Sequence, residues 1–408
     1  MPDVSTANGR AVDDPDATER FVYQPALDGL RALAVAIVVA FHYPPETART
    51  FRGGFLGVDA FFVLSGFLIT TLLVDEFRRT GSLRLRKFYA RRALRLFPAA
   101  SVLLAVGCVM WLFLKHSAPA RPQGIGLIGV AAYVANWVQI WKPGSLGELS
   151  HTWSLAIEEQ FYLLWPLALL FLLRRGARMR ALLAVIGTGI VASATWRIIV
   201  WHRAPLPHTS FVNYYLHVTN HVTPPAANAH LHLIHAWDRW YFGTDTRADA
   251  LLAGCFVAVV LAYTRGRIPA RATRALRIGT VPALLGALLI IWRAEVFTSG
   301  WVPNWGVLAF EVCIAVVIAG LITSPRSGAG QVLAIPPLVW VGRRSYAIYL
   351  FHPIIFRFLN NQVYDITWAQ AFVLSIAAVI AAAEISYRLV ETPALRLRTR
   401  FASEPAAE

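Results

Sequence analysis

Long apolar stretches alternate with short basic ones along almost the whole of this sequence. An apolar stretch of about 20 residues is long enough for a helix to cross the hydrocarbon core of a bilayer. Only 15% of the residues are charged, whereas a soluble domain of average composition carries about 25%. The sequence therefore predicts an all-α fold, a polytopic helical membrane protein.

We expect about ten transmembrane helices. A further apolar segment, 126–141, is either an eleventh crossing or a piece that re-enters or lies at the outer interface, sheltered by protein. The positive-inside rule favours ten, because both termini and the basic loops are then cytoplasmic. The predicted location is the inner or plasma membrane. The expected spans lie near 27–43, 54–75, 94–114, 153–173, 181–200, 244–263, 278–295, 305–323, 338–358 and 367–390.

Outside the spans, two terminal segments and one long loop are expected. Residues 1–22 are polar and lack the apolar region of a secretory signal, so they are predicted to be a disordered cytoplasmic tail. Residues 397–408 are expected to form a second cytoplasmic tail, and 23–396 the transmembrane domain. The long external loop, 201–242, is rich in histidine and is interpreted as a cover over an outer site.

The basic residues give a formal net charge of +15. Arginines beside apolar spans more often set membrane orientation than bind nucleic acid, so no nucleic-acid partner is predicted. The histidine-rich loop has no accompanying cysteines and no H-E-x-x-H spacing, so no metal site is predicted. Cys108, Cys255 and Cys313 lie inside apolar stretches and are expected to be small core residues.

The first apolar stretch, LDGLRALAVAIVVAFH, carries Arg31 near one end and His42 at the other. Eleven residues turn about 1100° on a helix, so the two side chains share a face and lie roughly 16 Å apart along the axis. Ionisable groups within a span are costly and usually face a water-filled cavity or a partner. The alternative is that Arg31 snorkels and His42 merely ends the span. We expect both to face a polar cavity.

The segment HTWSLAIEEQFYLLWP places two adjacent acids, Glu158 and Glu159, at the start of an apolar span. Ser154 and Glu158 are four residues apart and therefore lie on one helical face. One acid is expected to meet a cation on another helix or to act as an acid/base group. The alternative is a carboxylate stabilised by the helix dipole.

Two further motifs place charged residues beside or within spans. GGFLGVDAFFVLSGFLIT carries Asp59 in an otherwise apolar stretch, where it requires a cationic partner. FYARRALRLFP places Arg92 and Arg95 three residues apart on one face. Membrane topology alone can explain these arginines, and a phosphate clamp is the functional alternative, because guanidinium groups bind phosphate bidentately.

Together these motifs resemble the membrane-bound acyltransferase 3 family, members of which O-acetylate bacterial cell-surface polysaccharides. The resemblance extends from about Tyr23 to Arg396 and adds a late motif, SYAIYLFHPI, which contains His352. It implies acyl transfer from cytoplasmic coenzyme A to an extracytoplasmic hydroxyl. The motifs that carry it are LDGLRALAVAIVVAFH, GGFLGVDAFFVLSGFLIT, FYARRALRLFP, WSLAIEEQFYLLWP and SYAIYLFHPI.

The resemblance also implies roles for individual residues. His42 is expected to act as the general base, since imidazole titrates near working pH. Arg31 is expected to orient the thioester or stabilise charge, Glu158 to orient or tune His42, and Arg92 and Arg95 to hold the nucleotide phosphates. A covalent route through Ser154 is the weaker alternative. The remaining residues expected to bind substrate are Asp59, Ser65, His151, Trp153, Ser154 and His352.

No permanently bound cofactor is expected; acyl-CoA, with acetyl-CoA favoured, is the predicted donor substrate. The predicted acceptor is a glycan, a glycolipid or a related metabolite, in contact with the lipid bilayer. The SGNH-type domain of some family members is expected to be absent, so acceptor-side help would come from the 201–242 loop or a separate extracytoplasmic protein. A polytopic transporter or flippase for a glycolipid or polysaccharide precursor is the alternative, with His42 and Glu158 in a proton relay.

Overall fold

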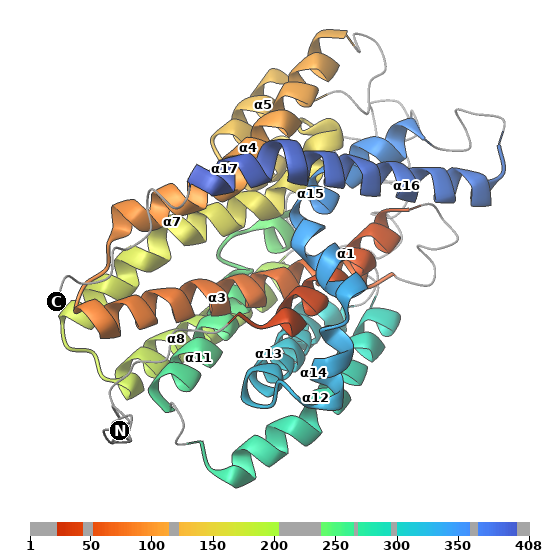
Figure 1. Ribbon diagram of the computed structural model, residues 1–408. Coiled ribbons are helices and arrows are strands. Elements are labelled where there is room, and N and C mark those ends of the chain that lie inside the picture. Colours follow the sequence, from red (N-terminus) through yellow and green to blue (C-terminus); the bar gives the residue numbers. More distant parts are fainter. Residues whose placement is uncertain are drawn as a thin grey trace, which may run out of the picture.

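The computed structural model describes residues 23–43, 52–113, 122–203, 238–264, 268–294, 300–359 and 366–397, and within these ranges it contains helices and no strand (Figure 1). The predicted all-α fold is confirmed. The predicted terminal tails lie outside these residues apart from Leu397 at the end of the last helix, as does 204–237 of the predicted external loop.

Each of the ten predicted spans contains one main helix. Eight helical segments are long and apolar enough to cross a membrane by length and composition. Of the other two, α11 has 17 residues and α15 carries two adjacent arginines. The number of crossings and the side of each terminus stay predictions. The ten helices are α1 (Pro25–His42), α3 (Gly57–Thr80), α4 (Leu85–Phe113), α7 (Trp153–Arg174), α8 (Met179–Arg203), α11 (Ala248–Thr264), α12 (Ala270–Arg293), α13 (Val307–Thr323), α15 (Pro336–Phe358) and α16 (Trp368–Ser386).

The ambiguous segment 126–141 forms two short helices, α5 (Gly124–Ala131) and α6 (Ala135–Trp141). The chain breaks between them at Tyr133, which has a φ of 54°, in the left-handed region that non-glycine residues rarely adopt. Neither helix approaches the roughly 20 residues that a crossing requires. The segment therefore does not form the single continuous helix of an eleventh span.

Helices α1 and α15 pack with their backbones in direct contact, and glycine makes this possible. A Cβ added at Gly342 of α15 would lie 1.8 Å from the carbonyl oxygen of Asp28 in α1. Small residues at helix interfaces in membranes permit this close approach. As a consequence, Arg343 is brought beside Asp28, where the two form an ion pair of 3.7 Å.

Shorter elements complete the fold around these helices. The chain continues from α16 through a π-helical turn, η5 (Tyr387–Glu391), into α17 (Thr392–Arg396), and this run lies against α4 (Figure 1). A 3₁₀ turn, η2 (Gly147–Thr152), leads directly into α7. The other short elements are η1 (Gly54–Leu56), the π-turn η4 (Val302–Gly306) and α14 (Gly328–Leu333).

A fully buried cluster of charged residues joins α3, α8, α11 and α13. Asp59 of α3 pairs with Arg247 at 3.2 Å, and Arg197 of α8 pairs with Asp249 of α11 at 2.5 Å, all four with side-chain exposures of 0%. Glu311 of α13 is equally buried. The expectation that Asp59 requires a cationic partner is therefore confirmed. Its expected contact with substrate is not supported, because Asp59 is enclosed in this ion-pair cluster.

Candidate active site

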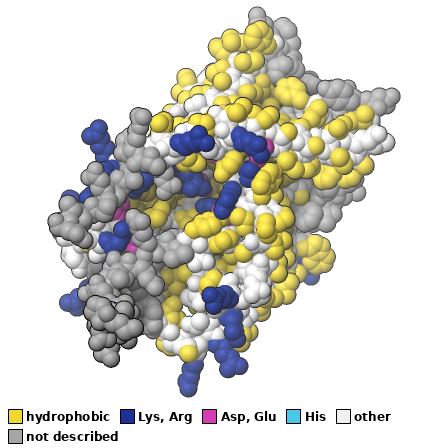
Figure 2. Space-filling view, viewed as in Figure 1, with side chains coloured by type: hydrophobic (Ala, Val, Ile, Leu, Met, Phe, Trp, Pro, Cys, Tyr) yellow, Lys and Arg dark blue, Asp and Glu magenta, His cyan; other side chains and the backbone are white. Residues whose placement is uncertain are grey.

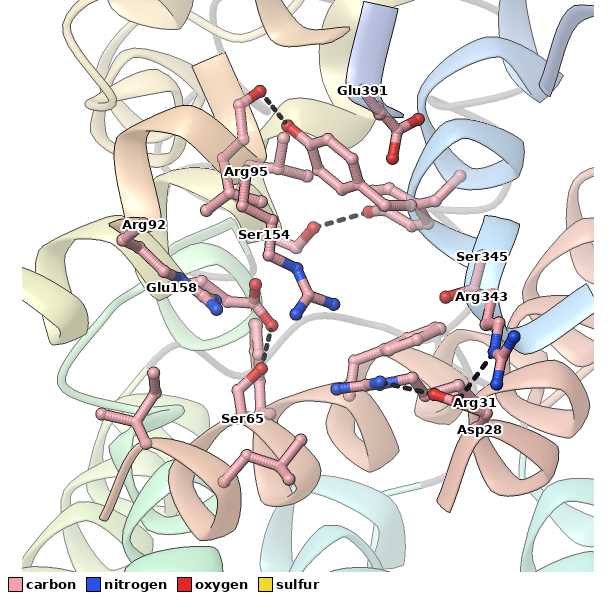
Figure 3. A pocket seen from close by; sticks show the side chains of 18 of the residues that line it. Asp28, Arg31, Ser65, Arg92, Arg95, Ser154, Glu158, Arg343, Ser345 and Glu391 are labelled. Carbon is pink, nitrogen blue, oxygen red and sulfur yellow. Dashed lines mark hydrogen bonds and ion pairs between the residues drawn. The ribbon is translucent and has the colours of Figure 1, made fainter. Parts of the chain in front are cut away.

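A cavity of about 530 Å³ lies between α1, α3, α4, α7, α15 and the η5–α17 run. Its volume is within the range typical of small-molecule sites. Six of the residues predicted from the sequence line it together: Arg31, Ser65, Arg92, Arg95, Ser154 and Glu158 (Figure 3).

The cavity carries an excess of positive charge. Four arginines line it, Arg31, Arg92, Arg95 and Arg343, against three acids. Apolar side chains from α3, α4 and α7 form much of the remaining wall. Figure 2 shows Lys and Arg side chains gathered among hydrophobic ones on the face seen in Figure 1. The cavity is therefore suited to a ligand with an anionic part and a slender, less polar part. The acids are Asp28, Glu158 and Glu391.

At one edge of the cavity, Asp28 forms hydrogen bonds or ion pairs with two arginines and a tyrosine. Its carboxylate accepts a hydrogen bond from Arg31 at 2.8 Å and one from the Tyr23 hydroxyl at 2.5 Å. Arg343 donates to the Tyr23 oxygen at 3.0 Å and lies over the Tyr23 ring. Burial and the neighbouring Asp28 raise the pKa of Tyr23, which keeps its phenol protonated. Tyr23 and Arg343 are about half exposed, so the cavity reaches the surface here.

On the opposite wall, Glu158 is held by two hydroxyls. It accepts hydrogen bonds from Ser65 at 2.8 Å and from Tyr162 at 3.1 Å. The guanidinium of Arg92 stacks over the Tyr162 ring, 3.7 Å from its centroid. Ser65 and Glu158 come from helices α3 and α7, so the pair ties two walls of the cavity together (Figure 3).

The π-helical turn η5 supplies a third wall. Tyr387 and Glu391, its first and last residues, both line the cavity. Arg344 of α15 stacks over Tyr387 and pairs with Glu384 one turn earlier. Single π-turns inside helices are rare and occur frequently at functional sites.

Beyond the cavity, at the end of α1, three imidazoles form a row. The ring of His42 lies 5.0 Å from that of His352, and the His352 ring lies 6.0 Å from that of His151. His42 is exposed, whereas His151 and His352 are buried. Within the described residues, no group of three His, Cys, Asp or Glu has the geometry of a metal site.

Backbone carbonyls fix the tautomers of two of these rings. Nδ1 of His42 lies 2.8 Å from the carbonyl oxygen of Val38, and Nδ1 of His352 lies 2.9 Å from that of Tyr349. A carbonyl only accepts hydrogen bonds, so in the neutral rings Nδ1 carries the proton and Nε2 carries the lone pair. His42 therefore presents a basic nitrogen at an exposed position.

Tyr349 and Ser154 connect the cavity with the histidine row. Both line the cavity, and their hydroxyl oxygens are 2.6 Å apart, the bond marked by the dashed line at Ser154 in Figure 3. The Tyr349 ring lies 5.7 Å from both His151 and His352. The hydroxyl of Ser154 thus contacts another hydroxyl and a carbonyl, neither of which is a base that would activate it as a nucleophile.

Comparison with known proteins identifies the family. A family model described as an acyltransferase domain matches residues 24–387. The chain belongs to the acyltransferase 3 family. Among curated members, it is similar to peptidoglycan O-acetyltransferase OatA of Listeria monocytogenes, with 36% identity over 91% of this chain and 56% of that protein.

Two further acyltransferase 3 relatives show a similar extent of matching. Putative peptidoglycan O-acetyltransferase YrhL of Bacillus subtilis is 32% identical over 92% of this chain and 55% of its own length. O-acetyltransferase OatA of Staphylococcus aureus is 32% identical over 91% and 57%. The chain thus spans little more than half the length of these curated relatives. No solved structure matches it.

Against the roles that membership of the acyltransferase 3 family suggested, the structure requires a correction at Glu158. The carboxylate of Glu158 is held by Ser65 and Tyr162, whereas the ring of His42 is oriented by the carbonyl of Val38. In the described part of the chain, Glu158 therefore does not pair directly with His42, although this pairing had been expected. Ser154 and Glu158 do share the cavity with Arg31, as the spacing predicted.

Three other predicted residues of this acyltransferase 3 chain are buried away from the cavity lining. His151 has both ring nitrogens near backbone carbonyls, of Glu148 at 3.2 Å and of Leu350 at 3.1 Å. Trp153 packs against Tyr241 and is 5% exposed. His352 is fully buried behind His42. These three side chains pack outside the cavity lining and do not face the cavity.

Sequence reasoning missed several residues that line the cavity of this acyltransferase 3 chain, among them Tyr23, Arg343 and Tyr349. Arg343 and Tyr349 lie on α15, six residues apart, and reach the cavity because α15 packs closely on α1. A usable signal was present, since the pair Arg343–Arg344 interrupts a predicted span, as Asp59 does.

Proposed function

We propose that this protein is an integral membrane O-acyltransferase that moves an acetyl group from cytoplasmic acetyl-CoA to a hydroxyl of peptidoglycan or a related cell-envelope glycan. The observation that carries the proposal is the continuity between two chemically different sites. A cavity with four arginines adjoins a row of imidazoles: Tyr349 lines the cavity and contacts two of the rings, and Ser154 lines the cavity and is hydrogen-bonded to Tyr349. The printed names of the relatives support the choice of acetyl group and glycan.

The arginine-lined cavity fits the donor. Coenzyme A combines anionic phosphates with a slender arm that ends in the thioester. Arg92, Arg95 and Arg343 would bind phosphates, since guanidinium groups grip them bidentately. Arg31, anchored by Asp28, would face the donor from the α1 side. The apolar walls from α3 and α4 suit the arm.

The exposed imidazole fits the acceptor side. Nε2 of His42 would take the proton of the acceptor hydroxyl as its oxygen attacks the thioester carbon. The carbon–sulfur bond then breaks, coenzyme A leaves as a thiolate, and the proton held by His42 passes through water to the thiolate, which restores the neutral imidazole. The Val38 carbonyl orients the His42 ring and fixes its tautomer. Glu158 would act on the donor side, balancing the charge of Arg92.

Radiolabelled acetyl-CoA tests this proposal directly. Purified protein in lipid vesicles would be incubated with acetyl-labelled donor and soluble peptidoglycan fragments. The expected product is a fragment that carries the label covalently and loses it in mild alkali, as an O-acetyl ester does. Movement of fragments across the membrane without any covalent label would support the transporter alternative and refute the proposal.

A further inference from the structure

Tyr349 occupies the boundary between the cavity and the histidine row. It is 7% exposed and lines the cavity, while its ring contacts His151 and His352. Tyr349 and Ser154 form the part of the cavity wall that contacts the histidine row through the Tyr349 ring. Tyr349 is thus a buried hydroxyl between the arginine-lined cavity and the histidine row.

The two hydroxyls at this point converge on one carbonyl oxygen. The Tyr349 hydroxyl oxygen lies 2.8 Å from the carbonyl oxygen of His151, and the Ser154 hydroxyl oxygen lies 3.3 Å from the same atom. The hydroxyl oxygens themselves are 2.6 Å apart, so one hydroxyl donates to the other, which leaves one proton for the His151 carbonyl. The arrangement is a hydrogen-bonded pair of hydroxyls beside a carbonyl oxygen, at the edge of the cavity.

We propose that Tyr349 is a catalytic residue whose hydroxyl, together with that of Ser154, donates hydrogen bonds to the oxygen of the reacting thioester carbonyl. This inference rests on the proposed acyl transfer. When the acceptor oxygen attacks the carbonyl carbon, the electron pair of the C=O bond moves to oxygen. When the carbon–sulfur bond breaks, that pair re-forms the carbonyl and the sulfur leaves with its own bonding pair.

The competition with His151 favours the transition state over the ground state. Hydrogen bonds to an ionised acceptor are roughly twice as strong as those between neutral groups. One hydroxyl proton can therefore stay between Ser154 and Tyr349 and the other on the neutral carbonyl of His151 while donor binds, and both can turn to the substrate oxygen as its negative charge develops. Interactions that strengthen only in the transition state raise kcat without tightening binding.

Replacing Tyr349 by phenylalanine separates this role from packing, because the ring is retained and only the hydroxyl is lost. Removing one such donor typically costs about 10²–10³ in kcat. The matched control is Tyr89→Phe. The Tyr89 hydroxyl also donates to a backbone carbonyl of α7, that of Leu163 at 2.9 Å, but Tyr89 lies outside the cavity.

The experiment measures kcat and KM with labelled acetyl-CoA, and the affinity for coenzyme A by calorimetry. We expect Tyr349→Phe to lower kcat by about 10²-fold or more while the affinity for coenzyme A changes less than about threefold. Ser154→Ala should shift kcat in the same direction, and Tyr89→Phe should match the wild type.

Two results would overturn the inference while leaving the proposed function standing. One is a Tyr349→Phe protein whose kcat stays within about threefold of wild type. The other is a loss of kcat that is matched by the same loss of coenzyme A affinity, which indicates a structural role. A wild-type protein that transfers no label would refute the proposed function and this inference with it.

Discussion

The imidazole rings of His42 and His352 lie 5.0 Å apart with their planes 68° from parallel. Both rings approach the carbonyl of the residue four positions earlier, Val38 at 2.8 Å and Ile348 at 3.1 Å. Both therefore present Nε2 as the basic nitrogen. His42 is exposed and His352 is fully buried, so His42 is the ring that an external hydroxyl can reach.

We predict that His42→Gln lowers turnover by about 10²–10⁴, the usual effect of losing a general base. The affinity for coenzyme A should remain, because His42 does not line the arginine cavity. Turnover with labelled acetyl-CoA and calorimetry check both parts. His202→Gln, an exposed histidine that contacts Asn304, is the control. A His42→Gln protein with more than about a tenth of wild-type turnover would show that another group is the base.

Arg343→Gln is expected to weaken binding of coenzyme A about fivefold, which corresponds to about 1 kcal/mol. The effect is modest because Arg343 is half exposed and its charge is screened by solvent. Raising the salt concentration should reduce the difference between the variant and the wild type. Arg326→Gln, an exposed arginine outside the cavity, serves as the control. Equal affinities of Arg343→Gln and wild type at low salt would exclude Arg343 from the donor site.

Gly342→Ala is expected to destabilise the protein by about 1–3 kcal/mol, the usual cost of overpacking a close contact. Its Cβ would lie 1.8 Å from the Asp28 carbonyl oxygen, so α15 and α1 would have to separate. Thermal unfolding in detergent measures the effect. Gly187→Ala in α8, where no atom lies within 4 Å of the added Cβ, should be neutral or slightly stabilising. Similar unfolding temperatures for the two variants would contradict the close helix contact.

Asp59→Ala is expected to cost about 3–5 kcal/mol of stability, because it leaves the buried guanidinium of Arg247 without its partner. The folded fraction should bind coenzyme A normally, since Asp59 does not line the cavity. Replacing Asp59 and Arg247 together by apolar residues should cost less than Asp59→Ala alone. A variant of wild-type stability that no longer binds donor would restore the substrate-binding role first expected for Asp59.

Hydrophobicity predicted the helices well because span length is a local property of the sequence. All ten expected windows contain helices, and the ambiguous segment 126–141 is broken at Tyr133. The short helices α5 and α6 were not predicted, since a single positive φ in an apolar run leaves no mark in hydropathy. The break between α5 and α6 follows from the positive φ of Tyr133, which is seen only in the folded chain.

For the site, the sequence predicted residues whose polarity is anomalous inside an apolar run. Arg31, Ser154 and Glu158 stood out in this way and do line the cavity. Tyr349 did not, because a tyrosine is ordinary in a membrane helix, and its place in the cavity arises from the close packing of α15 on α1 and from its hydrogen bond with Ser154. Glu158 lines the cavity, but its carboxylate contacts Ser65 and Tyr162 and not the expected His42, since helical spacing gives a face and not a neighbour.

Transfer across a sealed membrane is the central claim, and one measurement tests it most directly. Peptidoglycan fragments would be trapped inside proteoliposomes, and acetyl-labelled acetyl-CoA added only outside. The account predicts alkali-labile label on the trapped fragments in wild-type vesicles and none with His42→Gln. Label that forms only when donor and acceptor are on the same side would contradict a path from the arginine cavity past Tyr349 to His42.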